Sequence, residues 1–290
     1  MKNSKIGLLY ILPWIIGMVF LTLYPFINAL IISFTDYNLV REPNFIGFAN
    51  YAKLFKDKDF LGTLRQTLKY TVITVPLQLA FALFIAFILN FKLKAINFYR
   101  TAYYVPSLLG GNVAVAVLWR FFISTRWFIN HFLGIFGVGP VKWLSSGSGA
   151  MAVIVLLKVW QFGSAMLIFL AALKDVPQDL YEAASVDGAA KSYSFFQNYD
   201  SFDHTDDFLQ SGHAAGQCLP GIQRTLPYHE ERPLNSTYLT SMFIYDNAFQ
   251  LFNMGYASAA SWVLFIIIVS VTVVLFATQD RWVFYSDKGE

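Results

Sequence analysis

The stretch from Ile6 to Phe34 reads IGLLYILPWIIGMVFLTLYPFINALIISF and contains no Asp, Glu, Lys or Arg. A helix needs roughly 20 apolar residues to cross the hydrocarbon core of a bilayer, and this stretch is longer. Lys2 and Lys5 precede it, as in a secretory signal peptide. However, the apolar part of a signal peptide has roughly 7 to 15 residues and ends at a small-residue cleavage site, which this stretch lacks. We therefore expect an uncleaved transmembrane helix with a cytoplasmic N-terminus.

The composition of the whole chain also indicates a membrane protein. Of its 290 residues, 56% are apolar, 18% are aromatic and 13% are charged, whereas soluble domains have roughly 25% charged residues. This argues against a soluble enzyme. The net charge of +3 is not gathered into a basic stripe, so nucleic acid is not expected as a partner. The single Cys218 excludes a disulfide framework and a four-cysteine zinc site, and no cofactor is expected.

Four further apolar stretches predict transmembrane helices. The link from Phe91 to Arg100, between the second and third stretches, carries basic residues and no acid, which is typical of a short cytoplasmic loop. The sequence therefore predicts an all-α polytopic membrane protein in one domain, 1–290. Five spans are evident, at about residues 6–34, 70–89, 101–123, 150–173 and 257–278.

One segment, residues 198–232, does not share this composition. It holds six of the 18 acidic residues, three of the four histidines and Cys218. A single aspartate at the centre of a transmembrane helix costs roughly 2.5 to 3.5 kcal/mol. The segment contains several, so as written it cannot cross the membrane.

A short helix is predicted just beyond the fourth span. Asp175 can cap it, Pro177 suits its first turn, and Gly188 can adopt the left-handed conformation that ends a helix. On physical grounds alone, one interpretation is an interfacial helix that rests on lipid headgroups.

A resemblance favours a different interpretation of this helix. Residues 182–188, Glu-Ala-Ala-Ser-Val-Asp-Gly, resemble the cytoplasmic loop of ABC-importer permeases, whose coupling helix docks into a cleft of the ATPase subunit. The chain is similar to the first permease subunit of sugar and glycerol-phosphate importers, the class of the maltose-transporter permeases. The likeness covers nearly the whole chain outside 198–232. Further stretches that agree with it are Phe45–Tyr51, Arg100–Pro106, Leu118–Arg120 and Pro233–Thr237.

The resemblance implies the type I ABC-importer permease fold with six transmembrane helices. Residues 174–197 would form the cytoplasmic coupling loop, and 198–232 would stand in place of the fifth helix. The implied function is import of sugars or oligosaccharides across a bacterial inner membrane. The implied partners are a second homologous permease, two ATP-binding subunits and an extracytoplasmic sugar-binding protein. The residues implied in coupling are Glu182, Ala183, Ala184, Asp187 and Gly188.

The chain itself is not expected to be an enzyme. A phosphate-binding loop has the pattern G-x-x-x-x-G-K-[ST], and the nearest approach here is Gly188-Ala189-Ala190-Lys191-Ser192. This stretch lacks the glycine before the lysine. We therefore expect a separate subunit to hydrolyse ATP.

Two interpretations of the segment 198–232 stand side by side. In one, it is a genuine insert whose histidines and Cys218 bind a metal, which would make the chain an intramembrane metal-dependent enzyme. The spacings of His204, His213, Cys218 and His229 match no standard zinc site.

In the other interpretation, the segment results from two compensating frame errors, near Gln197 and near Arg232. Codons for Asn, Asp, His, Tyr and Phe end in a pyrimidine, and a shift of one base moves it to the middle position, which encodes mostly apolar or small residues. The shifted frame allows Ile-x-Ile-Pro in place of Asn198 to Ser201. The family has an Ile-x-Leu-Pro tail at this point. We favour this hypothesis.

Polar residues within the spans are candidates for a substrate path. Trp160 beside Gln161 can stack on a sugar ring while the amide bonds its hydroxyl groups. The same residues can instead join one helix to another, and Lys158 or Arg120 can extend toward a polar edge. The candidates for the path are Gln78, Asn112, Trp160 and Gln161, and Lys158 is a further polar residue inside a span.

Overall fold

The computed structural model describes residues 4–91, 94–123, 128–137, 139, 141–175 and 236–278. Within these residues every regular element is a helix, and the β structure is one isolated bridge, Thr35 to Phe45. The chain divides into two compact units. Unit 1 holds residues 1–65 and 238–268, and unit 2 holds residues 66–237 and 269–290.

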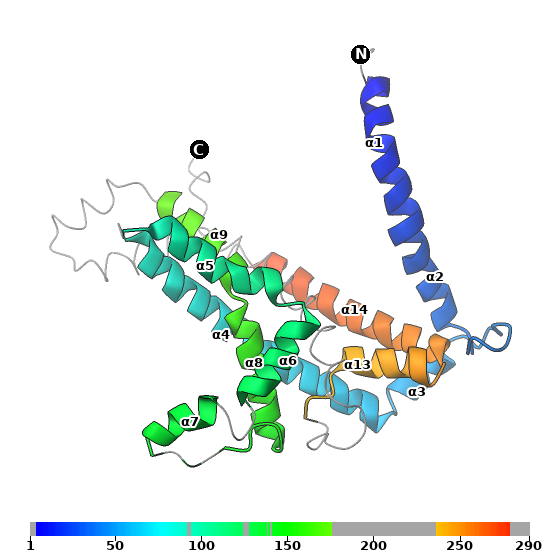
Figure 1. Cartoon of the computed structure of the whole chain (residues 1–290). Coiled ribbons are helices and arrows are strands. Elements are labelled where there is room, and N and C mark those ends of the chain that lie inside the picture. Colours follow the sequence, from blue (N-terminus) through cyan, green and yellow to red (C-terminus); the bar gives the residue numbers. More distant parts are fainter. Residues whose placement is uncertain are drawn as a thin grey trace. The chain divides into compact units, whose positions relative to one another are not determined.

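Unit 1 begins with a long helical segment. Helix α1 (Ser4–Met18) continues through the π-helical turn η1 (Val19–Leu23) into α2 (Tyr24–Ser33), and Figure 1 shows them as one continuous blue ribbon. Pro25 lies in the first turn of α2 and has no N–H to donate to the preceding turn. The wider π-helical turn η1 directly precedes this proline. It accommodates the missing hydrogen bond, so the helix continues into α2.

Helix α2 packs antiparallel against α14 (Met254–Thr278). The ring of Phe26 lies 4.6 Å from that of Trp262 and 5.3 Å from that of Phe265. At the other end of the contact, the backbone N–H of Gly255 donates to the carbonyl oxygen of Tyr37 over 2.9 Å. The end of α2 therefore meets the beginning of α14.

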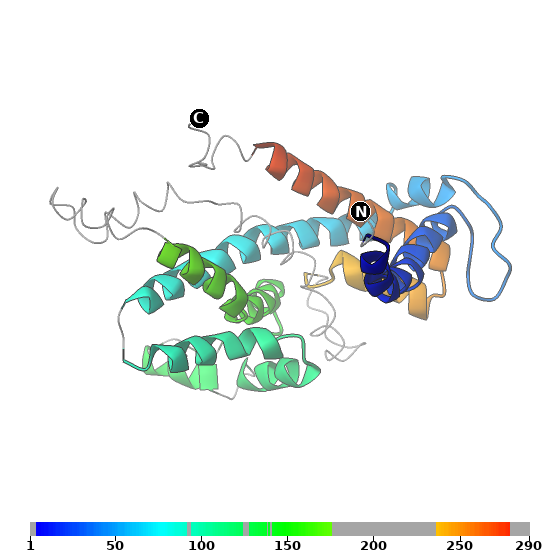
Figure 2. The ribbon, with the colours of Figure 1, turned by 90° about the horizontal axis from the view of Figure 1, so that it is seen from above.

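The core of unit 1 joins short helices to these longer ones. The short elements are α3 (Ala49–Leu54), α13 (Thr240–Tyr245) and the π-helical turn η3 (Asp246–Gln250). In both views α13 lies beside the first turns of α14 (Figure 1, Figure 2). Small alanines on α14 let aromatic rings approach closely, as is common between membrane helices. The buried cluster is Leu54, Phe60, Phe243, Tyr256, Ala259, Ala260 and Val263.

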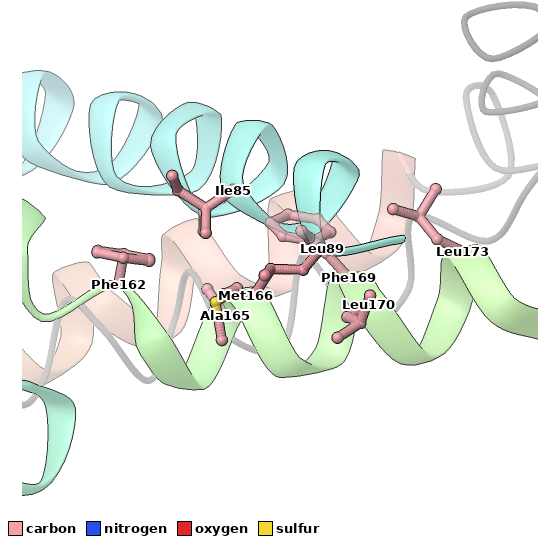
Figure 3. Packing of buried hydrophobic residues seen from close by; sticks show 10 residues of the cluster. Ile85, Leu89, Phe162, Ala165, Met166, Phe169, Leu170 and Leu173 are labelled. Carbon is pink, nitrogen blue, oxygen red and sulfur yellow. The ribbon is translucent and has the colours of Figure 1, made fainter. Parts of the chain in front are cut away.

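Unit 2 is arranged around the later part of α4 (Lys58–Asn90) and around α9 (Gly163–Asp175). The two helices run side by side in the same direction (Figure 2, Figure 3). Phe81 stacks edge-on against Phe162 at one end, and Leu89 belongs to the same cluster as Leu173 at the other. The buried cluster is Ala82, Ile85, Ala86, Leu89, Phe162, Ala165, Met166, Phe169, Leu170 and Leu173.

Two of the expected spans are each divided into two helices. The stretch 101–123 becomes α5 (Ile96–Leu109) and α6 (Val113–Ile123), inclined at 102°, with Gly110 and Gly111 at the break. The stretch 150–173 becomes α8 (Gly147–Trp160) and α9, inclined at 45°. A short helix, α7 (Phe128–Ile135), lies between these pairs in the chain.

Among the described residues, three helices are long and apolar enough to cross a membrane, or five if each bent pair is one span. The three are Tyr10–Ser33, Lys58–Asn90 and Met254–Thr278. The loop residues 176–197 and the segment 198–232 lie outside the described residues.

Candidate functional site: two helix breaks in unit 2

The break between α8 and α9 exposes a backbone carbonyl at Gln161. This oxygen accepts hydrogen bonds from the Nε2 of Gln78 on α4, over 3.1 Å, and from the hydroxyl of Ser107 on α5, over 3.0 Å. An unsatisfied carbonyl is costly in an apolar membrane environment, so a broken helix needs such partners. Polar side chains from two other helices therefore stabilise the break.

The side chain of Gln161 reaches the other break. Its Nε2 donates to the carbonyl oxygen of Gly110, over 3.3 Å, and to that of Leu157 within α8, over 3.2 Å. A Cβ at position 110 would collide with the Gln161 side chain, so this close approach requires glycine. The side-chain amide of Gln161, at the break between α8 and α9, thus provides a hydrogen-bond partner for a backbone carbonyl at the break between α5 and α6.

The beginning of α9 is fitted equally closely to α5. A Cβ at Gly163 would lie 2.7 Å from the carbonyl oxygen of Tyr103. The hydroxyl of Ser107 also accepts from the backbone N–H of Ser164, over 3.3 Å. Ser107 therefore bonds both sides of the α8–α9 break, a role that the sequence analysis missed. Its signal in the sequence is a serine three residues before Gly110 within an apolar span.

The other two predicted path residues lie close to these breaks along the chain. Asn112 is exposed, and its Oδ1 accepts from the backbone N–H of Ala114, over 3.0 Å, which caps α6. The half-buried Trp160 precedes Gln161, and its ring lies 5.8 Å from that of Trp119 on α6. The structure thus joins Gln78 to Gln161 directly and places Asn112 and Trp160 at the ends of the interrupted helices.

A second polar group, in unit 1, was not predicted. The carboxylate of Asp57 accepts from the backbone N–H groups of Asp59 and Phe60, over 2.8 and 3.3 Å, at the start of α4. It also accepts from the hydroxyl of Tyr256, over 2.6 Å. Lys53 lies 4.7 Å from the centre of the Tyr256 ring. The signal for Asp57 is its place directly before a helix, where aspartate is a preferred cap.

The environment of Asp57 favours the charged carboxylate. Burial acts to raise the pKa of Asp57, but the hydrogen bonds from Tyr256 and from the backbone N–H groups act in the opposite direction. The pKa of Asp57 therefore lies below its ordinary value.

A third polar contact fixes the end of α2. The amide Nδ2 of Asn50 donates to the carbonyl oxygens of Ser33 and Thr35, over 2.9 Å each. These carbonyls lie at the end of α2, where the helix itself supplies no partners. The hydroxyls of Ser33 and Tyr51 share a hydrogen bond of 2.7 Å. Asn50 and Tyr51 belong to a stretch that carries the family resemblance, and here they close a helix end.

The predicted coupling residues Glu182, Ala183, Ala184, Asp187 and Gly188 lie outside the described residues, as do the histidines of 198–232. Among the residues that the structure describes, no group of three His, Cys, Asp or Glu side chains is placed to hold a metal ion.

No family model matches the chain, but whole-length relatives do. It is 39% identical over 296 residues to the "Probable ABC transporter permease protein YesP" of Bacillus subtilis (strain 168), a match that covers 100% of this chain and 95% of that protein. It is 30% identical to the "Probable starch degradation products transport system permease protein AmyD" of Thermoanaerobacterium thermosulfurigenes, over 97% of this chain and 96% of that protein.

Solved structures give the same fold. A chain of a bacterial alginate ABC transporter, in complex with an alginate pentasaccharide-bound periplasmic protein, matches with a TM-score of 0.78 and 19% identity. The match covers 97% of this chain and 96% of that chain. The protein therefore belongs to the family of ABC transporter permease subunits, integral membrane components with several spans. The alternative interpretation as a metal-dependent enzyme has no support from these relatives.

Proposed function

We propose that the chain is the transmembrane permease subunit of a binding-protein-dependent ABC transporter that imports sugars or oligosaccharides into a bacterial cell. The observation that carries this proposal is the whole-length match to permease subunits, among them one named for starch degradation products. Its partners are a second homologous permease, two ATP-binding subunits and an extracytoplasmic sugar-binding protein. The separate ATP-binding subunits hydrolyse ATP, and the permease moves the substrate across the inner membrane.

The two facing helix breaks are proposed to lie on the substrate path. Transporters commonly bind substrates where membrane helices are interrupted, because freed backbone and polar side chains are available there. The Oε1 of Gln161 and the Nδ2 of Asn112 make no hydrogen bonds to the described residues. These groups can bond sugar hydroxyls, and the face of Trp160 can stack on a sugar ring.

The coupling to ATP is assigned to Glu182, Ala183, Ala184, Asp187 and Gly188, within the loop 174–197. Small alanines let a partner surface approach closely, and Glu182 offers a fixed charge to a basic group on the ATP-binding subunit. Closure of the two ATP-binding subunits can then move the membrane helices as rigid bodies. This assignment follows from the resemblance of residues 182–188 to the family motif.

The test is co-purification of the tagged chain with its ATP-binding subunit, together with sugar uptake by the complete importer in proteoliposomes. We expect Glu182→Ala to abolish recovery of the ATP-binding subunit and ATP-driven uptake. Glu42→Ala is the matched control, because Glu42 is an exposed glutamate in the first loop, and it should leave both unchanged. Stoichiometric zinc without an ATP-binding partner would instead support the metal-enzyme alternative.

For the segment 198–232, we propose compensating frame errors in the gene or in its sequencing. The match to YesP extends over 100% of the chain, so the likeness to the family is not confined to the part before the segment. This is the expected result when a second error restores the reading frame. The test is to sequence the coding DNA, and stop codons or charged codons throughout the second frame would reject the proposal.

If the frame errors are real in the cell, the chain as written should have misplaced topology after Leu173 and should not transport. The check is uptake by a complex assembled with this exact sequence. Measurable uptake would show that the segment is a working part of the protein.

A further inference from the structure

A cluster of aromatic rings lies at the end of the first span, in unit 1. The ring of Phe34, the residue after α2, lies 6.4 Å from that of Phe45 and 5.2 Å from that of Phe48. The ring of Tyr51 completes the cluster, 5.5 Å from that of Phe34. Despite these contacts, Phe45 is 79% exposed and Phe48 is 74% exposed. The cluster therefore presents two large apolar side chains to its surroundings.

The backbone holds these rings beside the end of α2. The N–H of Ile46 donates to the carbonyl oxygen of Phe34 over 2.9 Å, and an antiparallel bridge pairs Thr35 with Phe45. Gly47 follows with a φ of 58°, in the left-handed region that glycine adopts easily, so the chain turns and brings the next ring against Phe34. The exposed rings therefore have fixed positions relative to the span.

The part of the loop between the two sides of this bridge is polar. Residues 36–44 form its tip, where Asp36, Arg41 and Glu42 are exposed. The tip is closed by the carboxylate of Asp36, which accepts from the backbone N–H of Asn44 over 2.8 Å and from its side-chain amide over 3.3 Å. The loop thus has an aromatic base, next to the span, and a charged tip.

The position of the rings along the chain corresponds to the membrane–water interface. The first candidate span, Tyr10–Ser33, has 24 residues. A helix needs roughly 20 residues to cross the hydrocarbon core, so Phe34 comes where the chain leaves it. Aromatic side chains are enriched at this depth, because part of their surroundings is apolar and part is wet.

The exposed face of α2 leads directly to the rings. Ile27 and Ile31 are exposed, and their spacing from Phe34 places all three on one face of the helix. Phe26, which packs on Trp262 of α14, belongs to the neighbouring face. The exposed apolar surface of a membrane span therefore continues through Phe34 onto the rings of the loop. This continuity, together with the charged tip, identifies lipid as the partner of the rings.

We infer that Phe45 and Phe48 insert into the lipid at the membrane–water interface, between headgroups and acyl chains, and so fix the depth of the first span. Anchors at the interface set the tilt and position of membrane helices. The charged tip of the loop stays in water. The inference goes beyond the proposed function and does not depend on which substrate is imported.

The experiment attaches a nitroxide spin label to the complete importer, with this chain expressed from its natural gene and the native cysteines replaced by serine. The vesicles contain phosphatidylethanolamine and phosphatidylglycerol. We expect the label at Phe48→Cys to be reached more by oxygen, which dissolves in lipid, than by a water-soluble nickel chelate. Ile31→Cys should give the same order, and Glu42→Cys, in the tip, the reverse order. Phe45→Cys repeats the test at the second ring, in case Phe48→Cys does not assemble.

A second measurement tests whether the rings fix the depth of the span. The double variant Phe45→Ser, Phe48→Ser should shift the depth of a label at Ile27→Cys, because the apolar anchor is lost. Val40→Ser is the matched control, since it removes an exposed apolar side chain from the tip, and it should leave the depth unchanged. An unchanged depth in the double variant would contradict the anchoring role.

Two other outcomes of the label experiment contradict the inference. If the nickel chelate reaches the label at Phe48→Cys as readily as that at Glu42→Cys, the rings lie in water. If neither reagent reaches it, a protein surface covers the rings, and repeating the measurement without the sugar-binding protein shows whether that protein or the second permease is the partner. In both cases the inference is wrong, while sugar uptake by the same vesicles tests the proposed function separately.

Discussion

The two units of the chain satisfy their polar groups in different ways. Besides the neutral amide of Asn50, unit 1 uses charged residues at helix ends: Asp57 accepts from Tyr256, and Asp246, 7% exposed, accepts from Tyr238 over 2.8 Å. Unit 2 joins its helix breaks with neutral amides and hydroxyls, from Gln78, Ser107 and Gln161. Each neutral hydrogen bond contributes only about 0.5 to 1.5 kcal/mol net. Unit 1 therefore contains stronger, charge-assisted hydrogen bonds, whereas the described helix breaks of unit 2 are joined by weaker neutral ones.

The charged residues that the structure describes are also distributed differently between the two units. The described residues of unit 1 include Asp36, Glu42, Asp57, Asp59 and Asp246 beside their basic residues, whereas those of unit 2 include Asp175 alone. The basic residues of the described part of unit 2 are Lys69, Lys94, Arg100, Arg120, Lys142, Lys158 and Lys174. This difference applies to the described residues alone, and the following variants test the polar contacts of each unit.

The largest effect is expected at Gly255 in unit 1. A Cβ there would collide with the backbone carbonyl of Thr35, and backbone cannot move aside as a side chain can. We expect Gly255→Ala to lower the free energy of unfolding by about 3 kcal/mol, the upper part of the usual range for overpacking. The measurement is an SDS titration in mixed micelles. Gly62→Ala is the control, because nothing lies within 4 Å of the added Cβ, and a loss as large as that of Gly255→Ala would contradict the prediction.

A smaller loss is expected at Gly110 in unit 2, where the obstacle is the flexible side chain of Gln161. Gly110→Ala should cost about 2 kcal/mol by overpacking. In a Gln161→Ala background most of that cost should disappear, because the collision is removed. A double-mutant cycle on the free energy of unfolding measures this coupling. Strictly additive losses would show that the two breaks are not in contact.

Asp57→Asn keeps a capping side chain but removes the carboxylate charge, which should cost up to about 1 kcal/mol near neutral pH, the upper part of the range for an anion at a helix N-terminus. The pKa of Asp57 is lowered in the folded chain from its ordinary 3.8. Its contribution is therefore complete above the ordinary value and is lost as the pH falls through the lower, folded value. The difference in unfolding free energy between the parent and Asp57→Asn should shrink below about pH 3.8. A difference that grows on acidification would reverse the assigned sign, and Asp59→Asn serves as the control.

The smallest effect is expected at Lys53, whose ammonium lies over the Tyr256 ring. A cation–π contact near the surface contributes about 0.5 to 1 kcal/mol. Lys53→Met should therefore lower the free energy of unfolding by about 0.5 kcal/mol, whereas Lys56→Met should have no effect. Equal values for the two variants would indicate that the ring contact contributes nothing.

Hydropathy places the membrane helices but does not predict where they break. The stretch 150–173 contains no proline, and a glycine such as Gly163 is tolerated within a helix. The break is stabilised because the side chain of Gln78, which is 83 residues away in the chain, donates a hydrogen bond to the carbonyl oxygen of Gln161. No local pattern encodes such a partner. The pair of Gly110 and Gly111 is the one local signal, and it marks the break between α5 and α6.

The beginning of α4 shows a second limit of sequence patterns. The apolar stretch suggests a helix from residue 70, but the helix begins at Lys58. The first turns of α4 contain polar residues, so their mean hydropathy is too low to predict a membrane helix. The buried side chain of Phe60 and the cap at Asp57 stabilise these turns. Tyr256, which completes that cap, is 199 residues away. The coupling residues around Glu182 stay a prediction, because they lie outside the described residues.

The bond from Gly255 to Tyr37 also fixes how two spans are arranged within unit 1. The first span ends at this point and the last span begins there, antiparallel to the first. The loop after Ser33 and the turn before Met254 therefore face the same compartment. Reporter insertions at Val40 and at Leu251 should report the same side of the membrane.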